Sequence, residues 1–291
     1  MKFREAWKLL KGEITLLVLL VAAAGFLSAP GFLLRLYAFP VLILTGALAS
    51  MSAGLFNNLY DRDIDVVMRR TRSRESMISS RERFLYFLGT AMMVASFFIS
   101  WFLINLITAV FILSGFLSYL FLYTILLKRR TTWNIVIGGI AGGFPALAGW
   151  SAVTNSVSVT SLYIAFLVFI WTPTHFWSLA SGNKTDYTAA GVPMLPSTKS
   201  PEATANYISL NSAILILYTM VPVLLYLAGE GQIINVGMVF YALAIILNVF
   251  LLYYTLMQYQ SKYSVDVYRK TFHFSNYYLM LLLLGICVVV V

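Results

Sequence analysis

The segment 37–58 reads YAFPVLILTGALASMSAGLFNN and contains no lysine, arginine, aspartate or glutamate. A helix needs about 20 apolar residues to cross the hydrocarbon core of a bilayer, and this segment supplies 22 residues. An uncharged run of this length is typical of a membrane-spanning helix rather than of a helix buried in a soluble core. The segment therefore predicts that lipid surrounds at least this part of the chain.

The composition extends this prediction to the whole chain. Of its 291 residues 60% are apolar or aromatic and only 11% are charged, whereas soluble domains average about 25% charged residues. Disorder, a collagen-like fibre and a disulfide scaffold are excluded, the last because Cys287 is the single cysteine. The basic N-terminus leads into apolar residues without a clear small-residue cleavage site, so we interpret it as the first span and not as a signal peptide.

Counting apolar stretches of spanning length predicts an all-α fold, a single transmembrane domain over residues 1–291. Long apolar runs favour helices, because the strands of a membrane barrel alternate over about ten residues. Helices also satisfy their own backbone hydrogen bonds in lipid. The predicted bundle has nine transmembrane helices, at about 12–33, 37–58, 84–103, 106–127, 133–153, 160–180, 204–227, 233–257 and 273–291.

The positive charges give this bundle an orientation. Nineteen of the 20 lysines and arginines fall in segments that the nine spans place on one side, and only Arg35 falls on the other. The positive-inside rule then predicts a cytoplasmic N-terminus and a C-terminus outside. The net charge of +9 is thereby explained by topology, and no nucleic-acid partner is needed.

An acidic cluster follows the second predicted span. If that helix continues, Asn57, Asp61, Asp65 and Arg69 fall four residues apart and share one face. Two carboxylates and an amide oxygen in a row suit Mg²⁺, which binds few protein oxygens and completes its shell with water and phosphate. Arginines such as Arg72 follow directly, and guanidinium groups match phosphate oxygens. The alternative is a solvated helix end whose acids neutralise these arginines, but polar groups at membrane depth favour function.

Two further segments on the same predicted side carry candidate residues. The sixth span ends in WTPTHFWSLA, where Pro173 kinks the helix and His175 follows it, with Asp186 eleven positions further on. A lone histidine here is also compatible with a satisfied core residue. The fourth span ends in Lys128, which lies nearest the lipid core of a basic triplet and is best placed to face into the bundle.

Together these segments resemble the UbiA superfamily of intramembrane prenyltransferases, and within it the branch of protoheme IX farnesyltransferases (heme O synthases). The similarity extends over residues 50–200. It is carried by NNLYDRDID (57–65), MRRTRSR (68–74), LKRRTTWNIVIGGIAGGFPALAGWSAVTN (127–155), WTPTHFWSLA (171–180) and DYTAAGVPMLP (186–196). The NxxxDxxxD pattern marks only the superfamily, whereas the TPxHFW and DYxxAGxPMLP patterns are specific to the heme-modifying branch.

The resemblance implies a nine-helix bundle in the cell membrane, with its active site on the cytoplasmic side. It implies Mg²⁺-dependent transfer of a farnesyl group from farnesyl diphosphate to a vinyl group of heme B, giving heme O. Substrates are drawn from membrane lipid, and a heme A synthase or a terminal oxidase is a candidate partner. The implied metal residues are Asn57, Asp61, Asp65 and Asp186; those for the diphosphate are Arg69, Arg72, Lys128, Tyr123 and Asn134; those for heme are His175 and Trp177.

Two alternatives stay open at this point. A related prenyltransferase would act on a quinone precursor or a lipid alcohol, and the TPTHFW and DYTAAGVPMLP segments argue against it. A cation-coupled transporter is a different class, but transporters place ions near the membrane midplane, whereas these acids lie at its rim. The prenyl chain length, the number of metal ions and the oligomeric state do not follow from the sequence.

Overall fold

The computed structural model describes residues 3–69, 71–79 and 81–288, and this part of the chain folds into helices without a strand. Seven helices of the described part are long and apolar enough to cross a membrane. They are α3 (Ala38–Tyr60), α6 (Glu82–Leu103), α7 with η3 (Leu106–Leu117 and Ser118–Leu127), α8 with η4 and α9 (Asn134–Gly138, Gly139–Gly142 and Phe144–Thr154), α10 (Val159–Gly182), α13 (Pro201–Leu227) and α14 (Gly237–Gln260).

Two more helices pack among these seven. Helix α2 (Gly12–Leu27) has 16 residues and stops before the predicted boundary at 33, because Pro30 and the left-handed Gly31 (φ 76°) end it. Helix α15 (Val265–Cys287) starts eight residues before the predicted boundary at 273, where the Ser264 hydroxyl accepts a hydrogen bond from the Val267 N–H at 3.4 Å. The short elements are α1 (Phe3–Leu9), η1 (Phe32–Arg35), α4 (Arg62–Val67), η2 (Arg72–Arg74), α5 (Glu75–Ile78), α11 (Lys184–Ala189) and α12 (Leu195–Thr198).

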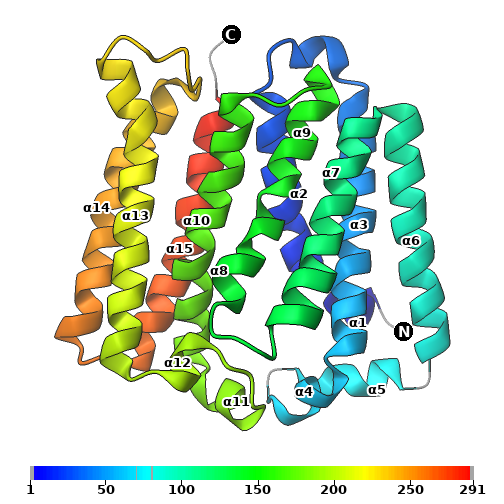
Figure 1. Cartoon of the computed structure of the whole chain (residues 1–291), viewed down its shortest axis with the longest axis vertical. Coiled ribbons are helices and arrows are strands. Elements are labelled where there is room, and N and C mark those ends of the chain that lie inside the picture. Colours follow the sequence, from blue (N-terminus) through cyan, green and yellow to red (C-terminus); the bar gives the residue numbers. More distant parts are fainter. Residues whose placement is uncertain (1–2, 70, 80, 289–291) are drawn as a thin grey trace.

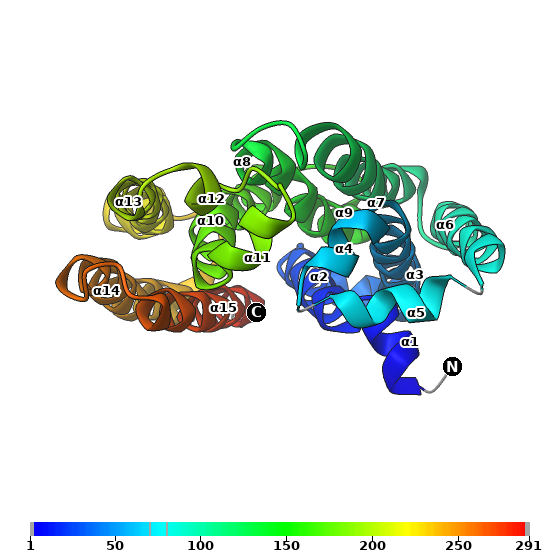
Figure 2. The same ribbon diagram turned by 90° about the horizontal axis from the view of Figure 1, so that it is seen from below.

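The long helices stand side by side, and the short helices gather at one end of the bundle. In Figure 1 the helices α4, α5, α11 and α12 lie at the lower end together with the N-terminus, while the C-terminus lies at the upper end. Figure 2 shows this lower end directly, with α4 and α11 on neighbouring sides of the bundle. The acidic segment after α3 and the segment after α10 are thus brought to the same end.

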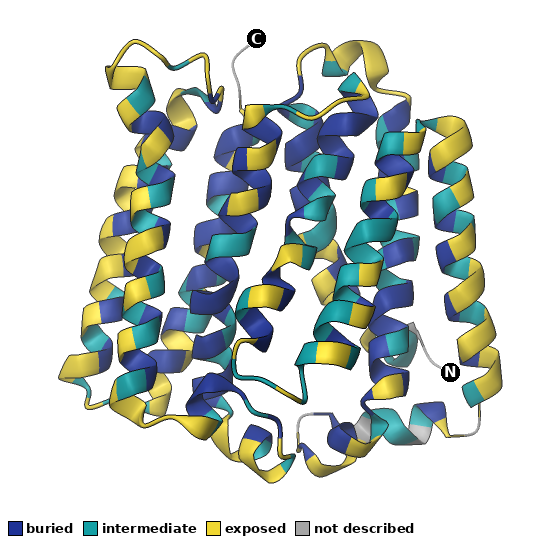
Figure 3. Ribbon diagram, viewed as in Figure 1, coloured by how far each residue is buried: buried dark blue, intermediate teal, exposed yellow. Residues whose placement is uncertain are grey.

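The outer surface of the bundle is apolar. Large side chains such as Phe87, Phe102, Leu217 and Leu227 are more than two-thirds exposed, and exposed residues follow the outward faces of the helices along their length (Figure 3). A soluble protein rarely exposes apolar surface on this scale. The arrangement is that of a multi-pass membrane protein whose side chains face lipid.

Helices α2 and α9 approach each other closely because glycines line their contact. A Cβ atom on Gly149 would lie 1.9 Å from the Ala22 carbonyl oxygen, and one on Gly25 would lie 2.1 Å from that of Ala146. Small residues three or four apart allow such backbone contact in membranes. Both helices line the cavity described below, so this contact fixes one of its walls.

We expect the substitution Gly149→Ala to destabilise the protein. The added methyl group collides with backbone rather than with a movable side chain, and overpacking of this kind costs about 1–3 kcal/mol. The measurement is the midpoint of thermal unfolding in detergent. Gly46→Ala is the matched control, because its Cβ would meet only the end of the Leu19 side chain, at 3.1 Å. Equal midpoints for the two variants would contradict the assigned contact.

Candidate active site

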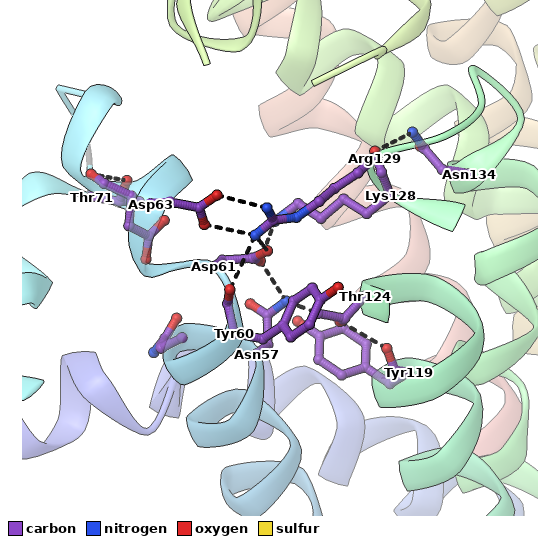
Figure 4. A network of polar contacts seen from close by, with 12 residues as sticks. Asn57, Tyr60, Asp61, Asp63, Thr71, Tyr119, Thr124, Lys128, Arg129 and Asn134 are labelled. Atoms are coloured by element: carbon purple, nitrogen blue, oxygen red, sulfur yellow. Dashed lines mark hydrogen bonds and ion pairs between the residues drawn. The ribbon is translucent and has the colours of Figure 1, made fainter. Parts of the chain in front are cut away.

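The candidate site begins at the carboxyl end of α3. This helix ends at Tyr60, and α4 begins just after Asp61. The helical spacing continues across the junction, because the Asp61 N–H donates to the Asn57 carbonyl at 2.9 Å and the Asp65 N–H donates to the Asp61 carbonyl at 2.8 Å. Asn57, Asp61 and Asp65 are exposed by 3%, 1% and 5%. They form a buried polar face at the end of α3. Figure 4 shows two members of this face, Asn57 and Asp61.

A different cation meets each member of this face. The Asn57 amide also donates from Nδ2 to Asp61 Oδ2 at 2.8 Å, which ties the row together. Arg74 Nη1 lies 3.1 Å from Asp65 Oδ2. The cations are Lys11 for Asn57, Lys128 for Asp61 and Arg74 for Asp65. Opposite charges inside a bundle compensate the desolvation that each would suffer alone.

Arg129 joins the outer rim of the cluster. It donates two hydrogen bonds of 2.7 Å to the Asp63 carboxylate and one of 3.0 Å to the Tyr60 carbonyl. It also lies 3.5 Å from Asp61 Oδ1. The hydrogen bonds from Arg129 hold the pKa of Asp63 below its usual value. Asp63 is the exposed acid of the segment, whereas Asp61 is enclosed (Figure 4).

The two arginines predicted from the sequence for diphosphate lie further out. Helix α4 ends at Val67, and Met68 adopts an extended conformation with ψ 122°, so the face does not continue to Arg69. Arg69 and Arg72 are exposed, and neither makes a side-chain hydrogen bond or ion pair with the described residues. Arg74 turns inward instead, through hydrogen bonds of 3.2 Å to Asn58 Oδ1 and 3.1 Å to Asp65 Oδ2.

A π-helical segment carries the opposite wall of the cluster. Within η3 the Lys128 N–H donates to the Tyr123 carbonyl five residues back, at 2.8 Å. The Thr124 hydroxyl donates to the Tyr119 carbonyl at 2.9 Å and accepts from Asn57 Nδ2 at 3.0 Å. Widened helical turns of this kind are rare in proteins, and those that do occur are often found at functional sites. Here the widening brings Tyr119, Thr124 and Lys128 to the same cluster.

Tyr123 and Asn134 hold the surroundings of Lys128. Tyr123 lines the cavity and packs on Gly138, where a Cβ would lie 2.6 Å from its ring. The Asn134 amide donates to the carbonyls of Thr131 at 2.7 Å and of Lys128 at 3.3 Å. Asn134 thus fixes the turn after Lys128, and its buried Oδ1 has no hydrogen-bond partner among the described residues.

Asp186 is on α11, at the same end of the bundle. It is half-buried and makes no side-chain hydrogen bond or ion pair with the described residues. No group of three or more acids, histidines or cysteines within reach of one metal ion occurs in the described part of the chain. The acids on the α3–α4 face and Asp186 therefore stand apart in this structure.

An apolar cavity of about 250 Å³ opens from the cluster into the bundle. Lys11 and Tyr119 line its polar end, and Lys11 donates to Tyr119 Oη at 3.0 Å. Its remaining wall is made almost wholly of apolar side chains and glycines. Members of that wall include Leu42, Gly46, Ala49, Ile112, Phe116 and Ala148.

His175 and Trp177 lie differently with respect to this cavity. His175 lines it and is 6% exposed, with its ring stacked on Trp171 at 4.2 Å between centroids. Trp177 is buried in another cluster, lines no part of this cavity, and packs against Tyr207 at 6.1 Å. Of the two residues predicted for heme, only His175 faces the cavity.

The cluster offers atoms that suit a divalent cation and an anion. Asp61 Oδ1 is buried without a hydrogen-bond partner among the described residues, and so are the Nε atoms of Arg74 and Arg129. A free carboxylate oxygen next to an amide and a second carboxylate suits Mg²⁺. Free guanidinium donors next to it suit phosphate oxygens. The residues present therefore fit a metal ion and a diphosphate.

Lys11 and Arg74 were not selected from the sequence. Lys11 counted only as a topology signal, yet the left-handed turn between α1 and α2 (φ 53°) places it beside Gly54, whose missing side chain leaves room for it. Burial, followed by the charges of Lys128 and Arg74, lowers the pKa of Lys11 to about 7. Only the three-dimensional fold distinguishes these two cations from their neighbours in sequence.

Known proteins are similar to this chain in sequence and in fold. Residues 17–277 match the UbiA prenyltransferase family. Protoheme IX farnesyltransferase 2 of Picrophilus torridus is 47% identical over 288 residues, which cover 99% of this chain and 98% of that protein. A solved digeranylgeranylglyceryl phosphate synthase superposes with a TM-score of 0.77 at 14% identity, covering 98% of this chain and 97% of that one. A UbiA homologue from Archaeoglobus fulgidus bound to GPP and Mg²⁺ superposes with a TM-score of 0.65 at 18% identity, covering 98% and 100%.

The match to the family extends over most of the chain, and the relative is similar from end to end. The solved structures share the fold at low identity. The chain belongs to the UbiA prenyltransferase family.

Proposed function

We propose that this enzyme transfers a farnesyl group from farnesyl diphosphate to a vinyl group of protoheme IX (heme B) and releases heme O. One observation carries the proposal: a buried cluster of carboxylates and cations caps an apolar cavity whose wall contains His175. The cluster suits a diphosphate, the cavity suits an isoprenoid, and the histidine suits a porphyrin iron. The relative named protoheme IX farnesyltransferase 2 supports this choice of acceptor.

The reaction needs the cluster to stabilise the departing diphosphate. The C–O bond of the farnesyl donor breaks, and the diphosphate leaves with the electron pair. The terminal vinyl carbon forms the new C–C bond to the allylic cation, and water adds to the neighbouring carbon and loses a proton. Fixed cations placed where negative charge develops lower such a barrier. Lys11, Lys128 and Arg74 occupy that place, and the apolar wall keeps water from the cation until the C–C bond has formed.

We assign Mg²⁺ to Asn57, Asp61 and Asp65, with Asp186 as a ligand that approaches from α11 when substrate binds. When bound, the ion supplies charge neutralisation for the diphosphate oxygens. The solved homologue with GPP and Mg²⁺ supports a divalent ion. Arg69 and Arg72 act at the exposed rim, where they attract the anionic donor, while Tyr123 and Asn134 hold the segment around Lys128.

We also propose nine membrane spans, formed by the seven long helices together with α2 and α15. The N-terminus and the active site then face the cytoplasm and the C-terminus faces outward. The distribution of lysine and arginine supports this orientation, because cytoplasmic segments carry their excess.

Incubation of the purified protein with heme B, farnesyl diphosphate and Mg²⁺ tests the function, with mass spectrometry as the readout. Heme O is the expected product, and chelation of Mg²⁺ with EDTA is expected to prevent its formation. Geranylgeranyl diphosphate in parallel reports the prenyl length that the cavity accepts. Absence of a prenylated heme with both donors, or prenylation of a quinone precursor in preference to heme, would contradict the proposal.

Lys11→Met is expected to raise the KM for farnesyl diphosphate by about tenfold, because it removes one charge-assisted contact of about 1.5 kcal/mol to the diphosphate. The control is Arg4→Met, which removes one positive charge from the same end of the chain at an exposed position. Steady-state kinetics with varied donor measures both. An unchanged KM in Lys11→Met would show that Lys11 contributes to the orientation in the membrane and not to binding of the donor.

A further inference from the structure

A serine on α15 completes the surroundings of His175. Ser275 Oγ lies 2.8 Å from His175 Nδ1, and Ser275 is 1% exposed. The Ser275 carbonyl accepts a hydrogen bond of 2.7 Å from the Trp171 indole. Trp171 in turn stacks on the imidazole, and Phe272 lies on it at 4.6 Å between centroids. Ser275 on α15 thus holds two aromatic side chains of α10, Trp171 and His175.

The donors around Ser275 determine where the imidazole proton lies. A serine hydroxyl has one hydrogen, and Ser275 Oγ donates it to the Phe272 carbonyl at 2.7 Å. Towards His175 the same oxygen is then an acceptor. Both hydrogen bonds of Ser275 Oγ form together only when the imidazole proton is on Nδ1 and the lone pair is on Nε2.

The second nitrogen of the ring, Nε2, belongs to a side chain of the cavity wall. His175 lines the cavity, and within the described part of the chain no group forms a hydrogen bond to Nε2. A neutral imidazole with its Nδ1–H bonded to an oxygen and its Nε2 free is the form that ligates metals in proteins. Trp171 and Phe272 on its faces fix the plane of the imidazole, and the contact with Ser275 selects the edge that carries Nδ1.

We propose that Ser275 is a positioning residue that holds His175 as the Nδ1–H tautomer, so that Nε2 ligates the iron of the porphyrin substrate. This inference rests on the proposed function, since it is the heme acceptor that brings an iron into the cavity. Axial ligation fixes the porphyrin at one wall while the diphosphate end of the donor is held by Lys11 and Lys128. The vinyl group is thereby held at a defined depth in the cavity.

The variants Ser275→Ala and Ser275→Cys test the proposal in the full-length protein. Both remove the strong oxygen acceptor, and cysteine keeps the volume nearly constant. Outer partners of metal-binding histidines typically contribute 10–100-fold to affinity. We expect both variants to bind heme B about tenfold more weakly, with a changed ferric Soret band, and to raise the KM for heme while leaving the KM for farnesyl diphosphate unchanged. Ser275→Thr keeps the hydroxyl and is expected to restore the wild-type spectrum.

Ser212→Ala is the matched control. Ser212 is buried and pairs with Thr174 at 3.2 Å, so this variant removes a comparable helix–helix hydrogen bond beside His175 without touching its ring. It should leave the heme spectrum unchanged. His175→Gly should lose the ligand-field signature, and added imidazole should restore it.

The outcomes separate this inference from the proposed function. Heme O formation by the wild type with unchanged heme spectra in Ser275→Ala and Ser275→Cys overturns the role of Ser275 and leaves the function standing. An unchanged spectrum in His175→Gly overturns the ligation itself. Failure of the wild-type protein to bind heme B overturns the acceptor, and the inference with it.

Discussion

Replacement of Asp61 by asparagine is expected to lower kcat for heme O formation by about 10²–10³-fold, the usual cost of removing one fixed electrostatic group from a transition state. Asp61 is the member of the cluster whose buried Oδ1 accepts no hydrogen bond from the described residues, and it also orients Lys128 and the Asn57 amide. Asparagine keeps the shape but removes the negative charge that a metal ion requires. The measurement is the rate of heme O formation at saturating donor, heme and Mg²⁺.

Asp63→Asn is the control for this experiment, because it removes a carboxylate two residues away that lies at the exposed rim and pairs with Arg129. Exposed ion pairs contribute about 0–1 kcal/mol, so we expect a change in rate within about fivefold. Loss of activity in Asp63→Asn together with full activity in Asp61→Asn would contradict the assignment, because the metal would then lie on the face of Asp63.

Gly46→Phe is expected to prevent binding of the farnesyl chain. Gly46 lines the cavity on α3, eight residues before Gly54 at its polar end, which corresponds to about 12 Å along the helix. A phenyl ring there fills the space that the distal part of the prenyl chain needs. We expect the KM for farnesyl diphosphate to rise at least about tenfold, while dimethylallyl diphosphate, which ends before the obstruction, keeps its affinity in equilibrium binding.

Leu44→Phe is the matched control for the blocked cavity. Leu44 is on the same helix, is 52% exposed and does not line the cavity, so the added ring contacts lipid. Its KM for farnesyl diphosphate should equal that of the wild type. Equal effects of Gly46→Phe on the long and the short donor would mean that the variant damages the fold rather than the depth of the cavity.

Much of this fold follows from local sequence properties. Uncharged runs such as 37–58 predict helices because a helix satisfies its own backbone in lipid, whereas barrel strands alternate in polarity. The structure has α3 at Ala38–Tyr60. The spacing of Asn57, Asp61 and Asp65 predicts a shared face because four residues approximate one helical turn. The backbone hydrogen bonds that link Asn57, Asp61 and Asp65 continue across the junction after Tyr60, so the predicted helical spacing is kept there.

The rest depends on contacts between distant segments. The π-helical turns of η3 have no evident signature in SYLFLYTILL. Yet they determine that Thr124 meets Asn57, that Lys128 meets Asp61, and that Tyr119 meets Lys11. Lys11 reaches the site because Gly54, which is 43 residues away in the sequence, leaves space for it. Such pairings arise from tertiary packing and cannot be obtained from propensity.

The arginine-rich segment shows the same limit. Arg69, Arg72 and Arg74 have the same side chain and lie in the same short segment. Helical spacing from Asp65 favoured Arg69 as the residue that faces the site. The extended Met68 turns the chain, so that Arg74 and not Arg69 reaches Asp65. Asp186 stays a predicted metal ligand, since it lies on α11 at the same end of the bundle but does not join the acids of the α3–α4 face in the described part of the chain.

We propose that the polar cluster and the apolar cavity bind the two ends of one molecule, the cluster its diphosphate and the cavity its prenyl chain. Calorimetric titration with the thiolo analogue of farnesyl diphosphate in the presence of Mg²⁺ measures the contribution of both ends. We expect the wild type to bind the analogue more tightly than it binds inorganic diphosphate or farnesol. Asp61→Asn should abolish the dependence of binding on Mg²⁺, and Gly46→Phe should abolish the gain in affinity from the prenyl chain. An analogue that binds no more tightly than inorganic diphosphate, or that binds Gly46→Phe as it binds the wild type, would contradict this proposal.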